Sequence, residues 1–153
     1  MPNSIAVGVS FSDQAIVAGS LDASPIGAVT PSTVVGTSIY STGELGYTAS
    51  AQGVVTQATS KSTAVTLNRS AGRITLNAES LAATTNVSFT LNNSFISAND
   101  TLILTISSGA TVAAYNCWVN SLGAGTASIT LRNTTAGALA EAVVINFALI
   151  HCV

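Results

Sequence analysis

Charge is the scarcest property of this sequence. Its 153 residues include four basic and six acidic side chains, and charged residues make up 7% of the chain, whereas soluble domains usually carry about 25%. The formal net charge is −2. A protein that binds nucleic acid needs a cluster of basic residues to neutralise phosphates. We therefore expect no nucleic-acid partner.

Long apolar runs are also missing, although 48% of the residues are hydrophobic and the mean hydropathy is +0.55. A helix that spans a membrane needs about 20 mostly apolar residues in succession. The best stretch, residues 138–153, is interrupted by Glu141, Asn146 and His151. The N-terminus lacks a basic leader followed by an apolar block. We expect neither a membrane partner nor a secretory signal peptide.

Histidine and cysteine, the usual metal ligands and nucleophiles, are rare. The sequence contains one histidine, His151, and two cysteines, Cys117 and Cys152. Because neighbouring residues of a strand point to opposite faces, His151 and Cys152 cannot readily share a metal ion or form a nucleophile and base pair. Cys117 and Cys152 could be buried free thiols or a disulfide, and the sequence leaves both possibilities open.

The remaining candidates for chemistry are scattered. Glu79, Asp100 and Glu141 lie in a short helix candidate, a turn and a strand start, so no two of them form the carboxylate pair of a glycosidase. Residues 123–125 contain two glycines but lack the helix and lysine of a phosphate loop. Lys61 lies among serines and threonines, where solvent should keep it protonated. We predict no catalytic, metal-binding or cofactor-binding residue, no cofactor and no enzymatic activity.

Apolar and polar residues alternate through most of the chain. This period of two, carried by β-branched and aromatic residues, predicts strands. The runs are residues 63–67, 73–77, 86–91, 101–106, 113–120, 127–131 and 142–150. Turn signals occur at residues 70–72, 107–109, 123–125 and 136–137. This pattern predicts an all-β, antiparallel sandwich or jelly-roll-like domain over residues 54–153.

Two local features refine this prediction. Residues 78–83 are the best helix candidate, with one or two turns at most. Tyr115 and Trp118 are three residues apart and should therefore lie on opposite faces of one strand, so at most one of them enters the core. The other is expected to contact a neighbouring subunit. A sugar-binding groove lined by both residues is the alternative, and the burial of one of them in the sandwich is favoured over it.

Residues 1–53 have a different composition. All three prolines lie here, together with many glycines and serines. Proline removes a backbone donor and favours extended conformations in its predecessor. Ile5, Val7 and Val9 alternate with small residues, as in a strand that adds to the edge of a neighbouring sheet. We predict an extended N-terminal arm that contacts other subunits.

Several phrases resemble those of tailed-bacteriophage structural proteins. Residues 23–32 read ASPIGAVTPS and are similar to a phrase in that family, and residues 53–68, GVVTQATSKSTAVTLN, resemble the opening of a β domain in virion proteins. The likeness continues through residues 72–77 (GRITLN), 87–91 (VSFTL) and 141–148 (EAVVINFA).

This resemblance implies a virion structural protein. The family that this chain resembles includes proteins that decorate and cement the capsid by bridging major capsid subunits on its outer surface, in many cases as homotrimers. Head fibres, tail fibres and tail appendages for host attachment are the alternative. The chain has no long fibre-forming repeat and no coiled-coil segment, and this favours the decoration protein.

Overall fold

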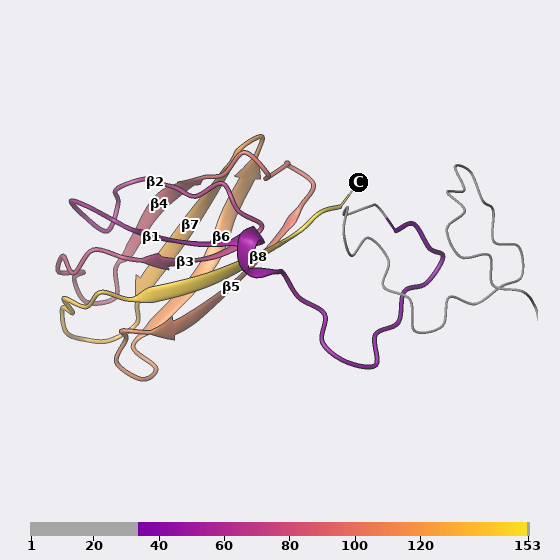
Figure 1. The fold of residues 1–153 in the computed structure, drawn as a ribbon. Coiled ribbons are helices and arrows are strands. Elements are labelled where there is room, and N and C mark those ends of the chain that lie inside the picture. Colours follow the sequence, from indigo (N-terminus) through magenta and orange to yellow (C-terminus); the bar gives the residue numbers. More distant parts are fainter. Residues whose placement is uncertain (1–33, 153) are drawn as a thin grey trace, which may run out of the picture. The chain divides into compact units, whose positions relative to one another are not determined.

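Two four-stranded sheets pack against each other in the part of the chain that the computed structural model describes, residues 34–152 (Figure 1). The first sheet has the order β1 (Gln52–Thr56), β3 (Ala71–Thr75), β8 (Val144–Ile150) and β5 (Thr101–Ser108). The second sheet has the order β2 (Val65–Thr66), β4 (Asn86–Asn92), β7 (Thr126–Asn133) and β6 (Tyr115–Gly123). The predicted all-β sandwich is confirmed.

The sheets are mixed rather than purely antiparallel. β1 pairs with β3, and β2 with β4, in parallel, whereas β8 and β7 form antiparallel pairs with both of their neighbours. The parallel pairs arise because the chain changes sheet after each strand from β1 to β5. At the two sides of the sandwich, β1 contacts β2 and β5 contacts β6.

Regular structure begins earlier than the sequence predicted. β1 begins at Gln52, before the expected start at residue 54, and the compact unit begins at Gly43. The Tyr47 hydroxyl donates a hydrogen bond to the Leu149 carbonyl of β8. A 3-10 turn, η1 (Ala49–Ala51), is the one helical element of the described residues, and none of their helices could cross a membrane. The predicted arm strand at residues 5–9 lies outside the described residues.

The core follows the predicted alternation. Its completely buried apolar side chains come from both sheets: Ile74, Leu91, Ile129, Leu131, Ile145 and Leu149. Tyr115 is buried, whereas the Trp118 side chain keeps 38% of its surface exposed. The prediction that these two aromatic residues lie on opposite faces of one strand is therefore confirmed.

Two local predictions were wrong. No helix forms at residues 78–83, because Leu81 pairs with Leu139 in an antiparallel bridge through two backbone hydrogen bonds of 2.8 and 3.0 Å. Residues 70–72 do not form the expected turn, because β3 already begins at Ala71. A side chain at Gly72 would place its Cβ 2.7 Å from the Leu67 Cδ2 atom, so glycine allows Leu67 to pack closely against β3.

Lys61 was expected in solvent but lies inside the protein, with 1% of its surface exposed. Its ammonium group donates hydrogen bonds to the Asn77 carbonyl and, over 2.6 Å, to the Glu141 carbonyl. The Lys61 backbone N–H donates to the Glu79 carboxylate over 3.1 Å. Burial lowers the pKa of Lys61, and the carboxylates of Glu79 and Glu141 oppose that shift. One side chain thus joins the loops after β1, after β3 and before β8.

Buried amides join other loops in the same way. Gln57 donates to the carbonyls of Lys61 and Thr63 over 3.0 and 2.8 Å. Asn133 is completely buried and donates to the Leu81 and Gly137 carbonyls over 3.0 and 2.8 Å. Unpaired buried carbonyls would be costly, so these side chains allow irregular loops to close the ends of the sandwich.

We predict that Lys61→Met lowers the free energy of unfolding by about 2–4 kcal/mol, because two carbonyls at the end of the sandwich lose their shared donor. Urea unfolding measures the change. Arg69→Met is the control, since this exposed arginine bonds through its side chain to the adjacent Asn68 carbonyl, and it should change stability by less than about 0.5 kcal/mol. Equal stabilities of the two variants would contradict the role given to Lys61.

Candidate functional site: the outer face of the first sheet

The outer face of the first sheet is nearly free of charge. Alternation points one set of side chains away from the core: Gln52, Val54 and Thr56 on β1; Ala71, Arg73 and Thr75 on β3; Val144, Asn146, Ala148 and Ile150 on β8; Thr101, Ile103 and Thr105 on β5. Arg73 is the single charged residue of this set. Val54, Ile103 and Ile150 keep 76%, 48% and 50% of their surfaces exposed. We call this set of residues the apolar face.

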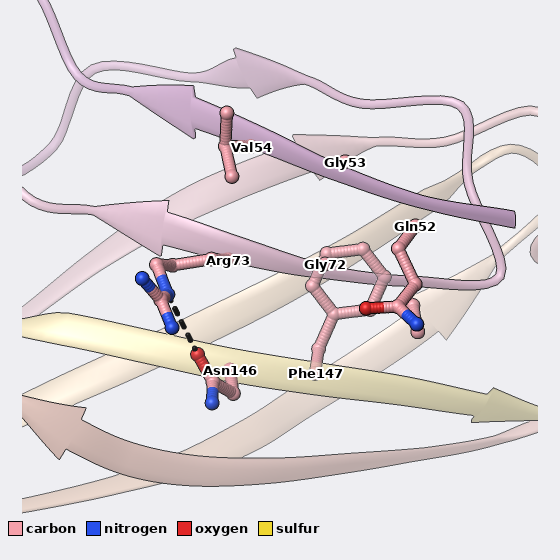
Figure 2. A pocket seen from close by; sticks show the side chains of 8 residues that line it. Gln52, Gly53, Val54, Gly72, Arg73, Asn146 and Phe147 are labelled. Atoms are coloured by element: carbon pink, nitrogen blue, oxygen red, sulfur yellow. Dashed lines mark hydrogen bonds between the residues drawn. The ribbon is translucent and has the colours of Figure 1, made fainter. Parts of the chain in front are cut away.

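The strand register explains the shape of this face. Ala71 and Ala148 are direct partners at its centre, and Gln52 and Ile103 flank them on the outer strands. Small side chains at the centre leave a shallow hollow of about 490 Å³ (Figure 2). Gln52, Val54, Arg73 and Asn146 line it, and the backbone of the glycine-containing strands forms part of its floor.

Arg73 lies across the sheet and points toward Asn146 on β8 (Figure 2). Its Nε atom donates a long hydrogen bond of 3.4 Å to Asn146 Oδ1. The guanidinium group has no carboxylate within ion-pair distance among the described residues. A single, weakly bound cation is a small electrostatic obstacle to covering this face, because only one charged group must lose water.

An acidic residue and the histidine meet at the end of the β5 and β8 pair. His151 Nδ1 lies 3.0 Å from Asp100 Oδ2, although the two residues are remote in sequence. The Asp100 side chain is almost completely buried and the His151 side chain is half exposed. Ser97 donates to Asp100 through its backbone N–H over 2.7 Å and its hydroxyl over 2.8 Å. The backbone N–H of Cys152 adds a third donor, at 3.3 Å.

These donors stabilise the charged carboxylate. The backbone N–H of Ser97 is the largest cause, and with the Ser97 hydroxyl, His151 and the Cys152 N–H it lowers the pKa of Asp100 to about 2. The Ser97 hydroxyl bonds to Asp100 and not to His151, so the order of groups differs from that of a serine, histidine and aspartate triad. This cluster fastens β5 to β8 at the edge of the apolar face.

Glu141 forms a second acceptor site near the other end of these strands. Thr111 donates to its carboxylate through the hydroxyl over 2.7 Å and through the backbone N–H over 3.1 Å. These bonds lower the pKa of Glu141. Burial raises the pKa of the neighbouring Tyr115 to about 12, and the Glu141 carboxylate adds to that effect. Both groups keep their usual charge at neutral pH, and the arrangement holds the loop between β5 and β6.

The structure separates the other candidate residues. Cys117 is half-buried and Cys152 is exposed, and both are free thiols. Burial raises the pKa of Cys117, which makes its reactive thiolate scarcer. The Glu79 carboxylate accepts a hydrogen bond from the Lys61 backbone N–H. It is not one of a pair of catalytic carboxylates. Among residues 34–152, no three His, Cys, Asp or Glu side chains gather as a metal site would require.

Two features of this region could not be read from the sequence. Asp100 and His151 were identified separately, because nothing in the local sequence shows that the ends of β5 and β8 meet. The apolar face was not recognised as a unit, since its exposed aliphatic residues come from strands far apart in the sequence, with Val54 on β1 at one edge of the sheet and Ile103 on β5 at the other. The departure from strict alternation at Ile103, an apolar residue on the polar side of its strand, was the one available signal.

Comparison of the chain with family models, with curated proteins and with solved structures gave no match.

We predict that Asp100 makes folding sensitive to acid. The Asp100 pKa of about 2 lies below the value of 3.8 expected without these contacts. Asp100 therefore stabilises the fold fully above about pH 4, and this stabilisation is lost as the pH falls toward 2. Asp100→Asn should reduce stability at neutral pH and flatten the dependence between about pH 4 and 2. Thermal unfolding across this range tests the prediction, and an unchanged acid profile in the variant would refute it.

Proposed function

We propose that this chain is a structural subunit of a tailed-bacteriophage virion that decorates and stabilises the capsid. In this proposal it acts as a homotrimer on the outer capsid surface and bridges major capsid subunits. The main support for this proposal is the apolar face. Val54, Ile103 and Ile150 remain exposed on it, and Arg73 is its only charged residue. An isolated domain gains nothing from such a face, whereas a subunit of an assembly can bury it.

The energetics of this face suit many small contacts. Burial of apolar surface contributes about 25 cal/mol per Å², so three partly exposed aliphatic side chains give a modest affinity per contact. Symmetry repeats each contact, and the avidity of several linked contacts exceeds that of any one. Because Arg73 is the only charged group of this face, binding should depend weakly on salt. A clamp built from such contacts would resist the separation of capsid subunits under the pressure of packaged DNA.

The finer features of the predicted fold belong to the same proposal. These are the jelly-roll-like arrangement of the sandwich and the extended N-terminal arm, which was predicted over residues 1–53 and which we now assign to residues 1–42, before the compact unit. We propose that the arm lies against the capsid shell and that the sandwich contributes the apolar face. The alternating residues at 5–9 and the prolines of the arm support this division of roles, because such a segment has few ways to bury a core alone.

We predict that Val54→Asp and Ile103→Asp each disrupt self-association and reduce particle binding at least about tenfold, because each places a negative charge in a buried apolar contact. Thr66→Asp is the control, since Thr66 is an exposed residue of the other sheet. Sedimentation measures the trimer, and imaging of particles with and without each protein measures decoration. Normal trimers and normal decoration by both variants would refute the proposed face.

We predict that a chain lacking residues 1–42 folds but no longer binds particles. The cut precedes Gly43, where the compact unit begins, and it keeps the Tyr47 hydrogen bond to β8. Circular dichroism and thermal unfolding should match those of the full chain within a few degrees. Full decoration by the shortened protein would show that the arm does not attach it.

A further inference from the structure

The outer face of the second sheet has a different chemistry from the apolar face. Its outward residues on β4 and β7 are serine, threonine and asparagine, with one arginine: Asn86, Ser88, Thr90, Asn92, Thr126, Ser128, Thr130 and Arg132. β6 adds Asn116 and Trp118. No aliphatic side chain and no carboxylate belongs to this set, which we call the polar face. Such a face offers little to an apolar protein surface but many hydrogen-bonding groups to a polar ligand.

Trp118 lies within this polar face. The register places it opposite Thr130, and Thr130 in turn lies opposite Ser88, whose hydroxyl is 2.7 Å from the Thr130 hydroxyl. More than a third of the tryptophan surface is exposed. Thr130 itself is buried, so the Ser88 and Thr130 hydroxyls serve each other, and the exposed part of the indole lies beside the asparagine and arginine side chains at the surface. Large aromatic rings are normally buried for their hydrophobic contribution, so a partly exposed ring on a polar face is suited to a ligand that is itself part apolar and part hydroxylated.

Arg132 is the one charged residue of the polar face. It lies between Asn86 and Asn116 in the register, diagonal to Trp118, and diagonal neighbours in a sheet are about 7 Å apart. Its guanidinium group makes no ion pair with any described residue, and β4, β6 and β7 contain no acidic residue. An uncompensated guanidinium favours an anionic partner, which it can bind through two parallel hydrogen bonds.

We propose that the polar face binds an oligosaccharide that carries an anionic group. One sugar ring packs its C–H face on the Trp118 indole, while its carboxylate or phosphate binds Arg132. The amides of Asn86 and Asn116, on either side of Arg132, donate to and accept from sugar hydroxyls. Because Trp118 and Arg132 are diagonal neighbours on β6 and β7, one sugar or two adjoining ones can reach both side chains. This inference does not depend on the role proposed for the apolar face.

Two other occupants fit the polar face less well. A single-stranded nucleic acid could stack a base on Trp118, but it would need a groove of several cations to follow its backbone, and this face has one. A second copy of the chain would bring the same polar groups and the same positive charge, so the two arginines would repel each other. Both occupants are outcomes of the test below.

Trp118 provides a direct signal, because it is the only tryptophan of the chain. The full-length protein is titrated with trigalacturonic acid, with its neutral galactose counterpart and with a phosphorylated sugar, and tryptophan fluorescence is recorded. Sodium acetate and inorganic phosphate serve as simple anions, and a short oligothymidine serves as the nucleic-acid probe. We expect a saturable change with an acidic sugar, and binding at least about tenfold weaker for the neutral sugar and the simple anions. The carboxylated and phosphorylated sugars identify which anionic group is preferred.

Three variants locate the binding by calorimetry, which does not need the tryptophan signal. Arg132→Gln should remove the preference for the acidic sugar, and Trp118→Ala should abolish binding. Arg73→Gln, the matched loss of an arginine from the other sheet, should bind like the unaltered protein. Thermal unfolding checks each fold. If Trp118→Ala does not fold, Trp118→Tyr keeps a ring and should retain weakened binding.

The proposal is overturned if no acidic sugar binds saturably up to millimolar concentration, or if the neutral sugar binds equally well. It is also overturned if Arg132→Gln and Arg73→Gln have the same effect. Tighter binding of oligothymidine than of any sugar would assign the face to nucleic acid, and dimers that Arg132→Gln strengthens would assign it to a second copy.

Discussion

The fold depends on one buried cation. The Lys61 ammonium group binds carbonyls that belong to segments before β8 and after β3, while its own backbone is held by Glu79 and by Gln57. A sandwich whose chain changes sheet after nearly every strand needs many crossing loops, and each loop brings carbonyls that no sheet can satisfy. In a protein with so few charges, the single lysine serves this internal purpose. Side chains of Asn93 and Asn133 complete the same task elsewhere.

The two outer faces divide the surface by chemistry. The first sheet presents exposed aliphatic groups among threonines and amides, with a shallow hollow, and the second presents hydroxyls and amides around one tryptophan but no aliphatic group. Both faces hold a lone arginine, but the environments differ. Arg73 has a hydrogen bond to Asn146 within a partly apolar surface, whereas Arg132 lies between two asparagines with no such bond. The same residue type is therefore a minor obstacle to burial on one face and a binding group on the other.

The strands could be predicted because their signal is local. Alternation over residues 86–91 and 127–131 reports directly on which side chains enter the core, and the opposite orientations of Tyr115 and Trp118 follow from their spacing alone. Pairing could not be predicted in the same way. The parallel pairing of β1 with β3 requires the chain to visit the other sheet in between, and no short window of sequence contains that information.

The errors share this cause. Residues 78–83 have good helix formers, but Leu81 gains more from its bridge to Leu139 and from the Asn133 amide than a short helix would provide. The serines and threonines around Lys61 indicate an exposed loop, and most of them are indeed in one. Burial of the lysine itself depends on the carbonyls of Asn77 and Glu141, the second of which is 80 residues away. The candidate faces were missed for the same reason, since each is assembled from strands distant in sequence.

The central position of β8 in the first sheet has a consequence for biosynthesis. β3 and β5 do not touch each other as partners, because β8 lies between them and pairs with both. A nascent chain that has emerged as far as β7 holds every strand of the second sheet and the β1 and β3 pair, but it cannot close the first sheet. Until β8 leaves the ribosome, the inner edges of β3 and β5 stay open to pairing with other chains, so closure of the first sheet must follow the synthesis of β8.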